Sequence, residues 1–336
     1  MQKKLGCLLY AICGIIKRGY FSATKVNFMK KSRIIYLPLM GRIGNQLFQY
    51  AFAYALQREL GSEVKILIDE YDVVNVNWTN SLRDYNLPNV EYVLGRDAEL
   101  NKRIGTGRLA YKAYRKWIYT EDARELFKRE MRCQKFLNKM GLIAFLRGYG
   151  DYRLNSNKSV FLYGYFQSEN YFKKYSNDIK GLFDKSHELQ ECRYPYIEDL
   201  ERRNSVCISV KIEHNAGSSI YDVCDEDYYR RAIGYIEENV DNPLYFLCSD
   251  NVDKAKELFF NDMNADIVCQ PKGYSVALTL SAMSKCKHFV INNTSFGWWA
   301  QYLSESKDKM VIAPSRWKIN DDPVSIYDNQ DSWHLM

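Results

Sequence analysis

Short apolar runs alternate with amphipathic stretches through the second half of the chain. Five of these runs are too short for helices and are rich in branched and aromatic side chains, which is typical of buried strands; they span residues 206–212, 244–248, 267–269, 289–291 and 310–313. Apolar residues recur at helical spacing in the segments near 227–239, 252–260, 275–285 and 295–304. Because strands that alternate with helices form parallel sheets, this half is predicted to be an α/β domain.

The first half begins with the same alternation. An apolar run over residues 33–40 predicts a strand, residues 45–60 predict a helix, and residues 64–69 predict a second strand. From about residue 100 to 150 the pattern becomes helical and rich in basic residues. The sequence therefore predicts an α/β protein with two Rossmann-like halves that face a cleft, and with a basic helical insertion in the N-terminal half.

The joint between the first predicted strand and helix has the character of a ligand-binding turn. Residues 41–56 read GRIGNQLFQYAFAYAL, in which Gly41 and Gly44 allow a tight turn and Asn45 is a suitable N-cap for the helix. A helix start of this kind exposes backbone amide donors that bind anions. By itself the segment also fits an ordinary turn between a strand and a helix.

A second joint, in the C-terminal half, carries a cluster of small polar residues. The sequence FVINNTSFGWWAQYL, residues 289–303, places Asn292, Asn293, Thr294 and Ser295 between a buried strand and a helix. Backbone amides at a helix start carry partial positive charge, and hydroxyl and amide side chains add further donors. This loop is predicted to hold a diphosphate without the help of a metal ion.

A third polar motif lies among aromatic residues. The sequence GYFQSENYF, residues 164–172, contains Gln167, Ser168 and Glu169 between tyrosines and phenylalanines. Polar side chains in such a setting fit ligand contacts, and by itself the segment also fits core packing.

Two groups of carboxylates have different interpretations. Asp250 follows the predicted strand LYFLCS and therefore lies where α/β folds place ligand contacts, at the carboxyl end of a strand. The acidic run at residues 225–227 directly precedes a predicted helix. We expect this run to cap the helix rather than to bind a metal ion.

The composition describes a folded chain with reduced thiols. The 336 residues include 27 tyrosines and six tryptophans, which is too much apolar surface for a disordered protein. The nine cysteines are scattered, without a CxxC pair, and several lie in strand-like apolar runs. They predict buried, reduced thiols in a cytoplasmic protein. The four histidines do not have metal-site spacing, so no structural zinc is expected.

The formal charge of +6 is concentrated in one segment. Residues 101–150 contain 13 Lys or Arg and four Asp or Glu, a local balance of 13 − 4 = +9. This basic helical region fits contact with an anionic membrane or with a phosphate-bearing acceptor, and it also fits a solvated helix face. No RNA- or DNA-binding motif accompanies it, so a nucleic-acid partner is not expected.

The N-terminus has an apolar run between basic residues. Residues 5–16 are almost entirely apolar, and Lys17 and Arg18 follow them. This run is too short for a helix that spans a bilayer, and it lacks a clear signal-peptide cleavage site. We expect a peripheral membrane contact or a disordered leader, with a short anchor as a third alternative.

In combination, these motifs resemble the inverting fucosyltransferases of glycosyltransferase family 11, the bacterial α-1,2-fucosyltransferase type. Residues 41–56 resemble the family's glycine-glycine-x-glycine-Asn-Gln-x-Phe-Gln-Tyr signature, and residues 164–172 match its central motif. LCSDN at residues 247–251 resembles its Ser-Asp-Asp segment. Residues 285–303, together with MVIAPSRW at residues 310–317, resemble its C-terminal block.

The resemblance, which covers about residues 33–318, implies a GT-B architecture that needs no metal ion or cofactor and binds GDP-fucose mainly through the C-terminal domain. We expect a leader or peripheral membrane segment at 1–32, an N-terminal acceptor-side domain at 33–195 with the insertion at about 100–150, a nucleotide-sugar-binding domain at 196–318, and a C-terminal tail at 319–336. The implied partners are a nucleotide sugar and a glycan acceptor, either free or lipid-linked. The expected location is the cytoplasm, at the inner face of the plasma membrane.

One strand of the C-terminal half departs from the family. Where the family's strand ends in His-x-Arg-Arg-Gly-Asp, this chain reads SVKIEHNAGSS, which places Lys211 at the histidine and Glu213 and His214 at the two arginines. Loss of one preorganised donor to a developing charge costs about 3 to 4 kcal/mol. Lys211 and Arg42 are the candidate substitutes for the missing cation. The alternatives are a different donor and a weak or inactive homologue.

The resemblance and the motifs together assign roles to individual residues. The predicted catalytic residues are Asn45, Glu213 and His214. The last two would act on the acceptor hydroxyl, and they also fit a solvated loop. The predicted donor-binding residues are Arg42, Gly44, Lys211, Asp250, Asn293, Thr294 and Ser295, and the predicted acceptor-side residues are Gln46, Gln167 and Ser168.

The predicted reaction is a single displacement with inversion, which transfers fucose to a glycan hydroxyl during the synthesis of surface polysaccharide or lipopolysaccharide. GDP-fucose is the donor that the resemblance implies. The alternatives are a glycosyltransferase that uses a different nucleotide sugar, and a non-catalytic homologue that binds carbohydrate or nucleotide.

Overall fold

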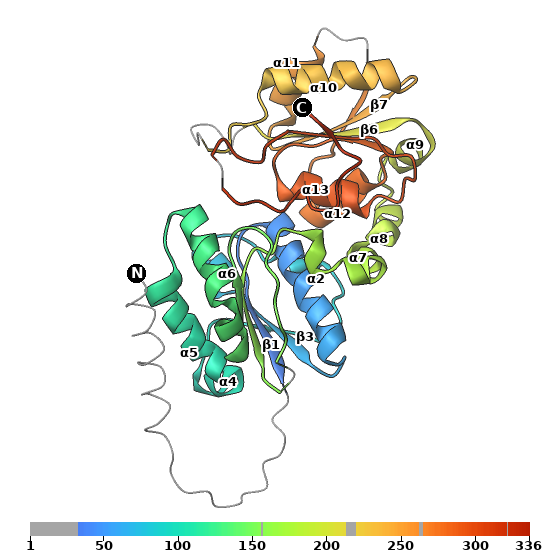
Figure 1. The fold of residues 1–336 in the computed structure, drawn as a ribbon. Coiled ribbons are helices and arrows are strands. Elements are labelled where there is room, and N and C mark those ends of the chain that lie inside the picture. Colours follow the sequence, from blue (N-terminus) through green and yellow to red (C-terminus); the bar gives the residue numbers. More distant parts are fainter. Residues whose placement is uncertain (1–32, 156, 213–219, 262–264, 321) are drawn as a thin grey trace, which may run out of the picture. The chain divides into compact units, whose positions relative to one another are not determined.

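The computed structural model describes residues 33–155, 157–212, 220–261, 265–320 and 322–336 (Figure 1). The predicted leader at residues 1–32 lies outside the described residues, and so do Glu213 and His214 of the predicted catalytic set. Residues 33–336 form one compact unit, which is built on two sheets.

The first sheet has five parallel strands in the order β3-β2-β1-β5-β4. Its strands are β1 (Ile34–Pro38), β2 (Lys65–Asp69), β3 (Val90–Val93), β4 (Leu142–Phe145) and β5 (Val160–Gly164). Ile35 of β1 pairs with Ile66 on one side and with Val160 on the other. The strands predicted at 33–40 and 64–69 are confirmed as β1 and β2, whereas β3, β4 and β5 were not predicted.

The second sheet has six parallel strands in the order β11-β10-β9-β6-β7-β8. Its strands are β6 (Ser205–Val210), β7 (Leu244–Ser249), β8 (Asp266–Cys269), β9 (His288–Val290), β10 (Val311–Ala313) and β11 (His334–Leu335). The five strands predicted in this half are confirmed, and β11 is an addition. The parallel α/β prediction therefore holds for both halves of the chain.

Helices connect these strands. The α-helices are α2 (Ile43–Leu60), α3 (Tyr71–Asn75), α4 (Ala98–Ile104), α5 (Thr106–Ala113), α6 (Ala123–Lys139), α7 (Ser176–Phe183), α8 (Ser186–Glu191), α9 (Ile197–Arg202), α10 (Glu226–Asn239), α11 (Val252–Phe260), α12 (Val276–Ser284) and α13 (Ser295–Leu303). Short 3-10 helices are η1 (Ser81–Asp84), η3 (Glu169–Tyr171) and η4 (Lys173–Tyr175), and η2 (Tyr114–Ile118) is a π-helix. Asp225 caps α10 by accepting from the amide of Tyr228, as the acidic run predicts.

The two faces of the first sheet are covered by different helices (Figure 1). Alternate residues of β1 face opposite ways, so Ile35 and Leu37 join the core that contains α2, while Ile34 and Tyr36 join a separate core with α4, α5 and α6. The basic insertion is therefore an integral layer of the fold. Most of its apolar residues are buried against the sheet, although Leu109, Trp117 and Met131 are exposed, and most of its charges are exposed while Glu130 is buried.

Helix α2 is buried along almost its whole length, which explains its apolar sequence on all faces. The helix begins at Ile43 and its N-cap residue is Arg42, so the prediction that Asn45 is the N-cap is wrong. Gly41, with φ of +75°, turns the chain out of β1 early enough for the helix to start before Asn45. The side chain of Asn45 is thereby available for contacts outside the helix.

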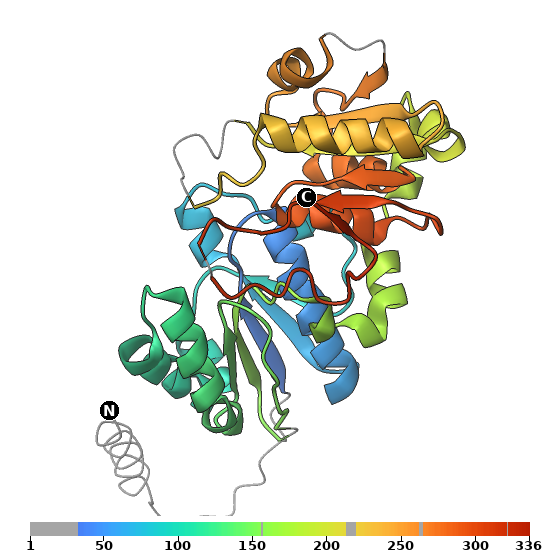
Figure 2. The same cartoon turned by 45° about the horizontal axis from the view of Figure 1, so that its top comes forward.

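The segment predicted as a C-terminal tail packs against both halves of the chain. Asp328 accepts a hydrogen bond from the Ser168 hydroxyl at 2.6 Å, and the Ile326 carbonyl accepts from Nε1 of Trp298 at 2.9 Å. The chain then ends in β11, which pairs with β10. Figure 2 shows the red C-terminal segment beside the first half before it returns to the second sheet.

The seven cysteines in the described part of the chain are free thiols. Cys207, Cys248 and Cys286 are buried, as their apolar surroundings predict, whereas Cys192 is exposed and does not follow the prediction of buried thiols. Among the described residues, no helix combines the length and the apolar character that crossing a membrane requires.

Candidate functional site

Three of the predicted motifs meet at the side chain of Asn45. Its Oδ1 atom accepts a hydrogen bond from Nε2 of Gln167 at 2.8 Å and another from Oγ of Ser295 at 3.0 Å. Gln167 follows β5 of the first sheet, whereas Ser295 begins α13 beside the second sheet. These three residues, which we call the Asn45 cluster, therefore link the start of α2 to both the central motif and the C-terminal block.

A glycine makes this meeting of helix starts possible. A Cβ atom on Gly44 would lie 2.7 Å from the backbone carbonyl carbon of Ser295 and 2.8 Å from the backbone nitrogen of Phe296. Cβ atoms in proteins essentially never come so close to backbone atoms. Nε1 of Trp299 also donates to the Gly44 carbonyl oxygen at 2.9 Å. Figures 1 and 2 show the upper end of α2 beside α13. Gly44, predicted as a donor-binding residue, is thus the point where the two helix starts touch.

The position of Gln167 depends on an unusual backbone conformation. The preceding residue, Phe166, has φ of +52°, a conformation that bulky side chains rarely adopt. Its ring is buried against Phe52 and Tyr171, which holds the strained conformation in place. Such strain persists only where the surroundings enforce it, and it is common at functional sites. Here it directs Gln167 toward Asn45.

The two cations proposed to replace the missing arginines lie close enough to interact. Lys211 follows β6 and is half-buried, and Arg42 precedes α2 and is exposed. Burial lowers the pKa of Lys211, and the positive charge of Arg42 lowers it further, while Asp250 opposes both effects. Neither Arg42 nor Lys211 lies within ion-pair distance, 4.0 Å, of a carboxylate in the described residues. Two positive side chains from opposite halves of the chain therefore share one region.

Asp250, which directly follows β7, lies in the same region. Its Oδ1 atom accepts a hydrogen bond from the backbone amide of Ile212 at 2.7 Å. Because β6 and β7 are parallel neighbours, their carboxyl ends meet at one edge of the sheet, as ligand-binding residues of α/β folds do. Asp250 is thus held beside Lys211 by the backbone of the residue that follows it.

The loop at residues 292–295 is fixed by its own side chains. Nδ2 of Asn293 donates to the carbonyl oxygens of Tyr221 and Trp317, both at 3.0 Å. Thr294 donates to Oδ1 of Asn292 at 2.6 Å and accepts from the amide of Gly297, so it is the N-cap of α13. These contacts give Asn293 and Thr294 structural roles.

The loop still retains polar groups that could contact a ligand. Oδ1 of Asn293 is buried and has no hydrogen-bond partner among the described residues. A buried acceptor without a partner is costly, so it marks a place for a water molecule or a ligand donor. The hydroxyl of Ser295 belongs to the Asn45 cluster.

Gln46, predicted on the acceptor side, is fully buried and uses all its polar atoms within the chain. Nε2 donates to the carbonyl oxygens of Gly41 at 2.8 Å and Thr79 at 2.9 Å, and Oε1 accepts from the amide of Ser81 at 2.8 Å. The side chain thus holds the loop at residues 79–81 against the glycine turn. Its direct contact with an acceptor stays a prediction, and its described contacts are structural.

Ser168 is also fully buried. Its hydroxyl donates to Asp328 and accepts from the amide of Asn170 at 3.2 Å, so it caps η3. This hydroxyl attaches the central motif to the C-terminal segment. Among the three predicted acceptor-side residues, Gln167 is therefore the one whose side chain belongs to the Asn45 cluster.

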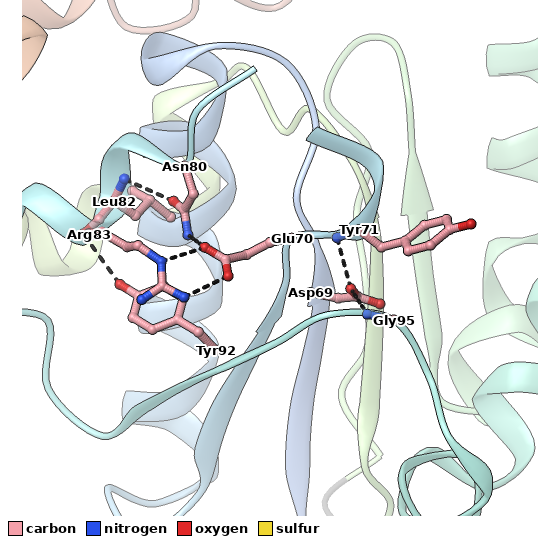
Figure 3. A network of polar contacts seen from close by, with 8 residues as sticks. All are labelled: Asp69, Glu70, Tyr71, Asn80, Leu82, Arg83, Tyr92 and Gly95. Carbon is pink, nitrogen blue, oxygen red and sulfur yellow. Dashed lines mark hydrogen bonds and ion pairs between the residues drawn. The ribbon is translucent and has the colours of Figure 1, made fainter. Parts of the chain in front are cut away.

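Sequence reasoning missed a polar network at the carboxyl end of β2 (Figure 3). Glu70 accepts two hydrogen bonds from Arg83, both at 2.6 Å, and one from Nδ2 of Asn80 at 2.7 Å. The hydrogen bonds from Arg83 lower the pKa of Glu70 below its ordinary value. Nothing in the local sequence marks these residues, because they are brought together by the turn between α3 and η1.

Comparison with known proteins places this arrangement in a family. The model of glycosyl transferase family 11 matches residues 34–332. The O-antigen biosynthesis glycosyltransferase WbnK of Escherichia coli is 27% identical over 314 residues, which cover 89% of this chain and 99% of that protein. An α-1,2-colitosyltransferase of Escherichia coli is 24% identical over 292 residues, which cover 84% of this chain and 92% of that protein.

The fold is also similar to a solved structure. The NodZ α-1,6-fucosyltransferase co-crystallized with GDP superposes with a TM-score of 0.50 at 16% identity, over 82% of this chain and 93% of that chain. The GT-B-like α/β fold that the sequence predicts is thus confirmed. The match of the family model over nearly the whole described chain settles the classification: the chain belongs to glycosyl transferase family 11.

Proposed function

We propose that the protein is an inverting glycosyltransferase that needs no metal ion or cofactor and transfers fucose from GDP-fucose to a hydroxyl group of a glycan. The hydrogen bond between Asn45 and Ser295 carries this proposal, because it brings the turn with Arg42 to the second half of the chain, where the charge of Arg42 acts on Lys211. Cleavage of the bond between a sugar and a nucleotide leaves charge on the diphosphate, and two preorganised cations stabilise that charge in the transition state. Membership of the glycosyltransferase family agrees with this chemistry.

The donor in this proposal lies between the two halves of the chain. Lys211 and Asp250 contact it from the second sheet, and Arg42 contacts it from the glycine turn. Arg42 offers a planar pair of donors that suits phosphate oxygens, whereas Lys211 supplies a point charge. Together they take the place of the arginine pair that the family has after β6.

The acceptor hydroxyl in this proposal attacks the anomeric carbon from the side opposite the diphosphate. The Asn45 cluster positions the reacting groups, since its oxygen already holds Gln167 and Ser295 in fixed places. Glu213 and His214 stay the proposed groups for accepting the proton of the attacking hydroxyl.

The identity of the sugar separates the two leading versions of the proposal. GDP-fucose follows from the resemblance of the motifs to fucosyltransferases. A different nucleotide sugar is the alternative, and the name of one relative, α-1,2-colitosyltransferase, supports it. The name of the other relative, an O-antigen biosynthesis glycosyltransferase, supports a surface-polysaccharide acceptor.

A ligand-observed NMR binding screen tests the proposal. GDP-fucose, GDP-mannose, UDP-glucose and free GDP are offered to the full chain in buffer that contains EDTA. Selective binding of GDP-fucose is the expected result, and transfer of fucose to a glycan then establishes turnover. Preference for another nucleotide sugar would replace the donor in the proposal, and binding of none of the four would contradict it.

We also propose that the protein contacts an anionic membrane through one face of α6. The exposed residues of this helix form a stripe, the α6 stripe, which consists of Arg124, Lys128, Met131, Arg132, Lys135 and Lys139. Their spacing of three or four residues puts them on one side of the helix, and the opposite side is buried in the core. An anionic lipid surface complements five cations in a row. This contact would place the protein at the inner face of the plasma membrane, near a lipid-linked acceptor.

The triple variant Lys128→Glu, Arg132→Glu and Lys135→Glu tests this contact. Each basic residue near an anionic surface contributes about 1 kcal/mol, so affinity for vesicles that contain phosphatidylglycerol is expected to fall about a hundredfold or more. Vesicle cosedimentation measures it. The control variant Lys254→Glu, Lys256→Glu and Lys272→Glu makes the same change in net charge at exposed positions elsewhere. Equal losses in both variants would contradict a specific role for α6.

A further inference from the structure

Trp78 is an exposed aromatic side chain beside one of the proposed donor-binding residues. It lies in the turn between α3 and η1, and 42% of its surface is exposed. The guanidinium carbon of Arg42 lies 5.7 Å from the centre of its ring. Arg42 in turn lies close enough to Lys211 to influence its charge. Trp78 thus lies beside Arg42, which is one of the two proposed donor-binding cations.

The turn that carries Trp78 is held firmly in the first half of the chain. The amide of Trp78 donates to the Val73 carbonyl oxygen at 2.9 Å, and Asn77 has φ of +56°. Gln46 then binds the backbone of Thr79, immediately after Trp78, to the glycine turn. The tryptophan is therefore exposed although both sides of its turn are anchored.

A second set of contacts anchors the end of the same turn (Figure 3). Asn80 is buried, donates to Glu70 and accepts from the amide of Leu82 at 2.9 Å. Nε and Nη2 of Arg83 both donate hydrogen bonds to the carboxylate of Glu70 and hold it in place. These polar contacts hold the backbone of the turn that carries Trp78.

An aromatic ring that stands on an anchored turn and is left in contact with solvent is suited to a ligand with an apolar face. Pyranose rings have such faces, because their C–H groups lie on one side, and they stack on tryptophan while their hydroxyls bond to neighbouring polar groups. Arg42 supplies a neighbouring donor. A side chain on an anchored backbone adds affinity with less loss of conformational entropy than one on a mobile loop.

We infer that Trp78 is a stacking platform for a sugar ring of the acceptor glycan. This inference rests on the proposed function, in which the donor diphosphate lies at Arg42 and Lys211. Single displacement needs the acceptor on the side of the sugar opposite the departing diphosphate. Trp78 belongs to the first half of the chain, in which the sequence predicts the acceptor-side domain, whereas Lys211 and Asp250 belong to the second half.

Saccharide binding tests the inference separately from transfer. Saturation-transfer NMR and tryptophan fluorescence are measured with methyl galactoside, methyl glucoside, methyl N-acetylglucosaminide and lactose as probes, and GDP is titrated in parallel. Trp78→Ala is expected to lower saccharide affinity by about tenfold and to leave the affinity for GDP unchanged. Trp78→Phe should lose less, because a smaller ring still stacks.

Trp117→Ala is the matched control. Trp117 is exposed to a similar extent, 44%, and also lies beside a cation, with Nζ of Lys116 5.0 Å from its ring centre, but it belongs to η2 in the insertion. Its loss should change neither affinity. Unchanged saccharide affinity in Trp78→Ala would overturn the inference, and so would a wild-type protein that binds none of the probes at millimolar concentration.

A loss of GDP affinity equal to the loss of saccharide affinity would also overturn it, because Trp78 would then stack on the base of the nucleotide. The two arms separate this inference from the proposed function. If wild-type protein binds saccharide at Trp78 but no nucleotide, the donor proposal fails and the platform stands. If it binds GDP and no saccharide, the inference about Trp78 fails and the donor proposal stands.

Discussion

Replacement of Lys211 by alanine is expected to lower kcat/KM for the nucleotide sugar by about a hundred- to a thousandfold. The side chain is half-buried at the carboxyl end of the second sheet, where the charges of Arg42 and Asp250 both act on its pKa. Loss of its charge leaves the departing diphosphate with one cation fewer in a setting where water cannot fully replace it. Steady-state transfer kinetics measure the effect.

Lys256→Ala, on the exposed side of α11, is the control for this variant and should retain full activity. A thermal unfolding curve for Lys211→Ala should match that of the wild type, because the side chain makes no ion pair among the described residues that the fold requires. Full activity in Lys211→Ala would remove Lys211 from the donor site.

The same residue gives the donor site a characteristic pH dependence. The pKa of Lys211 is held below its ordinary value, first by burial and then by the charge of Arg42. Affinity for GDP is therefore expected to be full below this lowered pKa and to be lost as the pH rises through it. Arg42→Ala is expected to bind GDP more weakly and to lose its GDP affinity at a higher pH, because the charge of Arg42 no longer lowers the pKa of Lys211. Lys211→Arg should abolish this pH dependence, since arginine stays charged.

Replacement of Gly44 by alanine is expected to have the second-largest effect. The added Cβ would collide with the backbone of Ser295 and Phe296, which cannot move without shifting α13. Overpacking of this kind costs about 1 to 3 kcal/mol or more in the free energy of unfolding. Transfer activity should fall by more than the loss of folded protein explains, because separation of the helix starts breaks the contact between Asn45 and Ser295.

Gly234→Ala, in the middle of α10, is the matched control for Gly44→Ala. A Cβ at this position meets nothing within 4 Å, so the variant should be unchanged or more stable by up to about 1 kcal/mol. Differential scanning calorimetry compares the two variants with the wild type. Equal melting temperatures for all three proteins would show that the helix starts do not touch as described.

Local sequence patterns were sufficient for much of the fold. The strand and helix on either side of residues 41–44 follow from apolar runs and glycines, and the repeated strand-helix alternation determines a parallel sheet in the second half. The strand β3 was missed because its sequence, VEYV, is short, contains a glutamate and is only partly buried, and β4 was hidden within the basic insertion. The strand β11 is only two residues long and depends on its pairing with β10.

The arrangement of the candidate site depends on contacts that local patterns do not contain. Asn45 and Ser295 were each identified from a motif, yet their contact joins residues 250 positions apart. Burial decides the roles of Gln46 and Ser168, and the sequence alone does not indicate that their polar atoms are used inside the protein. Trp78 carried no signal at all, because its significance comes from the anchored turn and from Arg42.

The proposed diphosphate site at Arg42 and Lys211 is the central claim, and calorimetric titration of GDP in EDTA-containing buffer at low ionic strength tests it most directly. The titration compares the wild type with Arg42→Ala, Lys211→Ala and the double variant, all checked for native folding. Our account predicts that the wild type binds GDP, that each single variant binds it more weakly, and that the double variant shows no measurable binding. GDP affinity that is the same in the double variant and the wild type would contradict it.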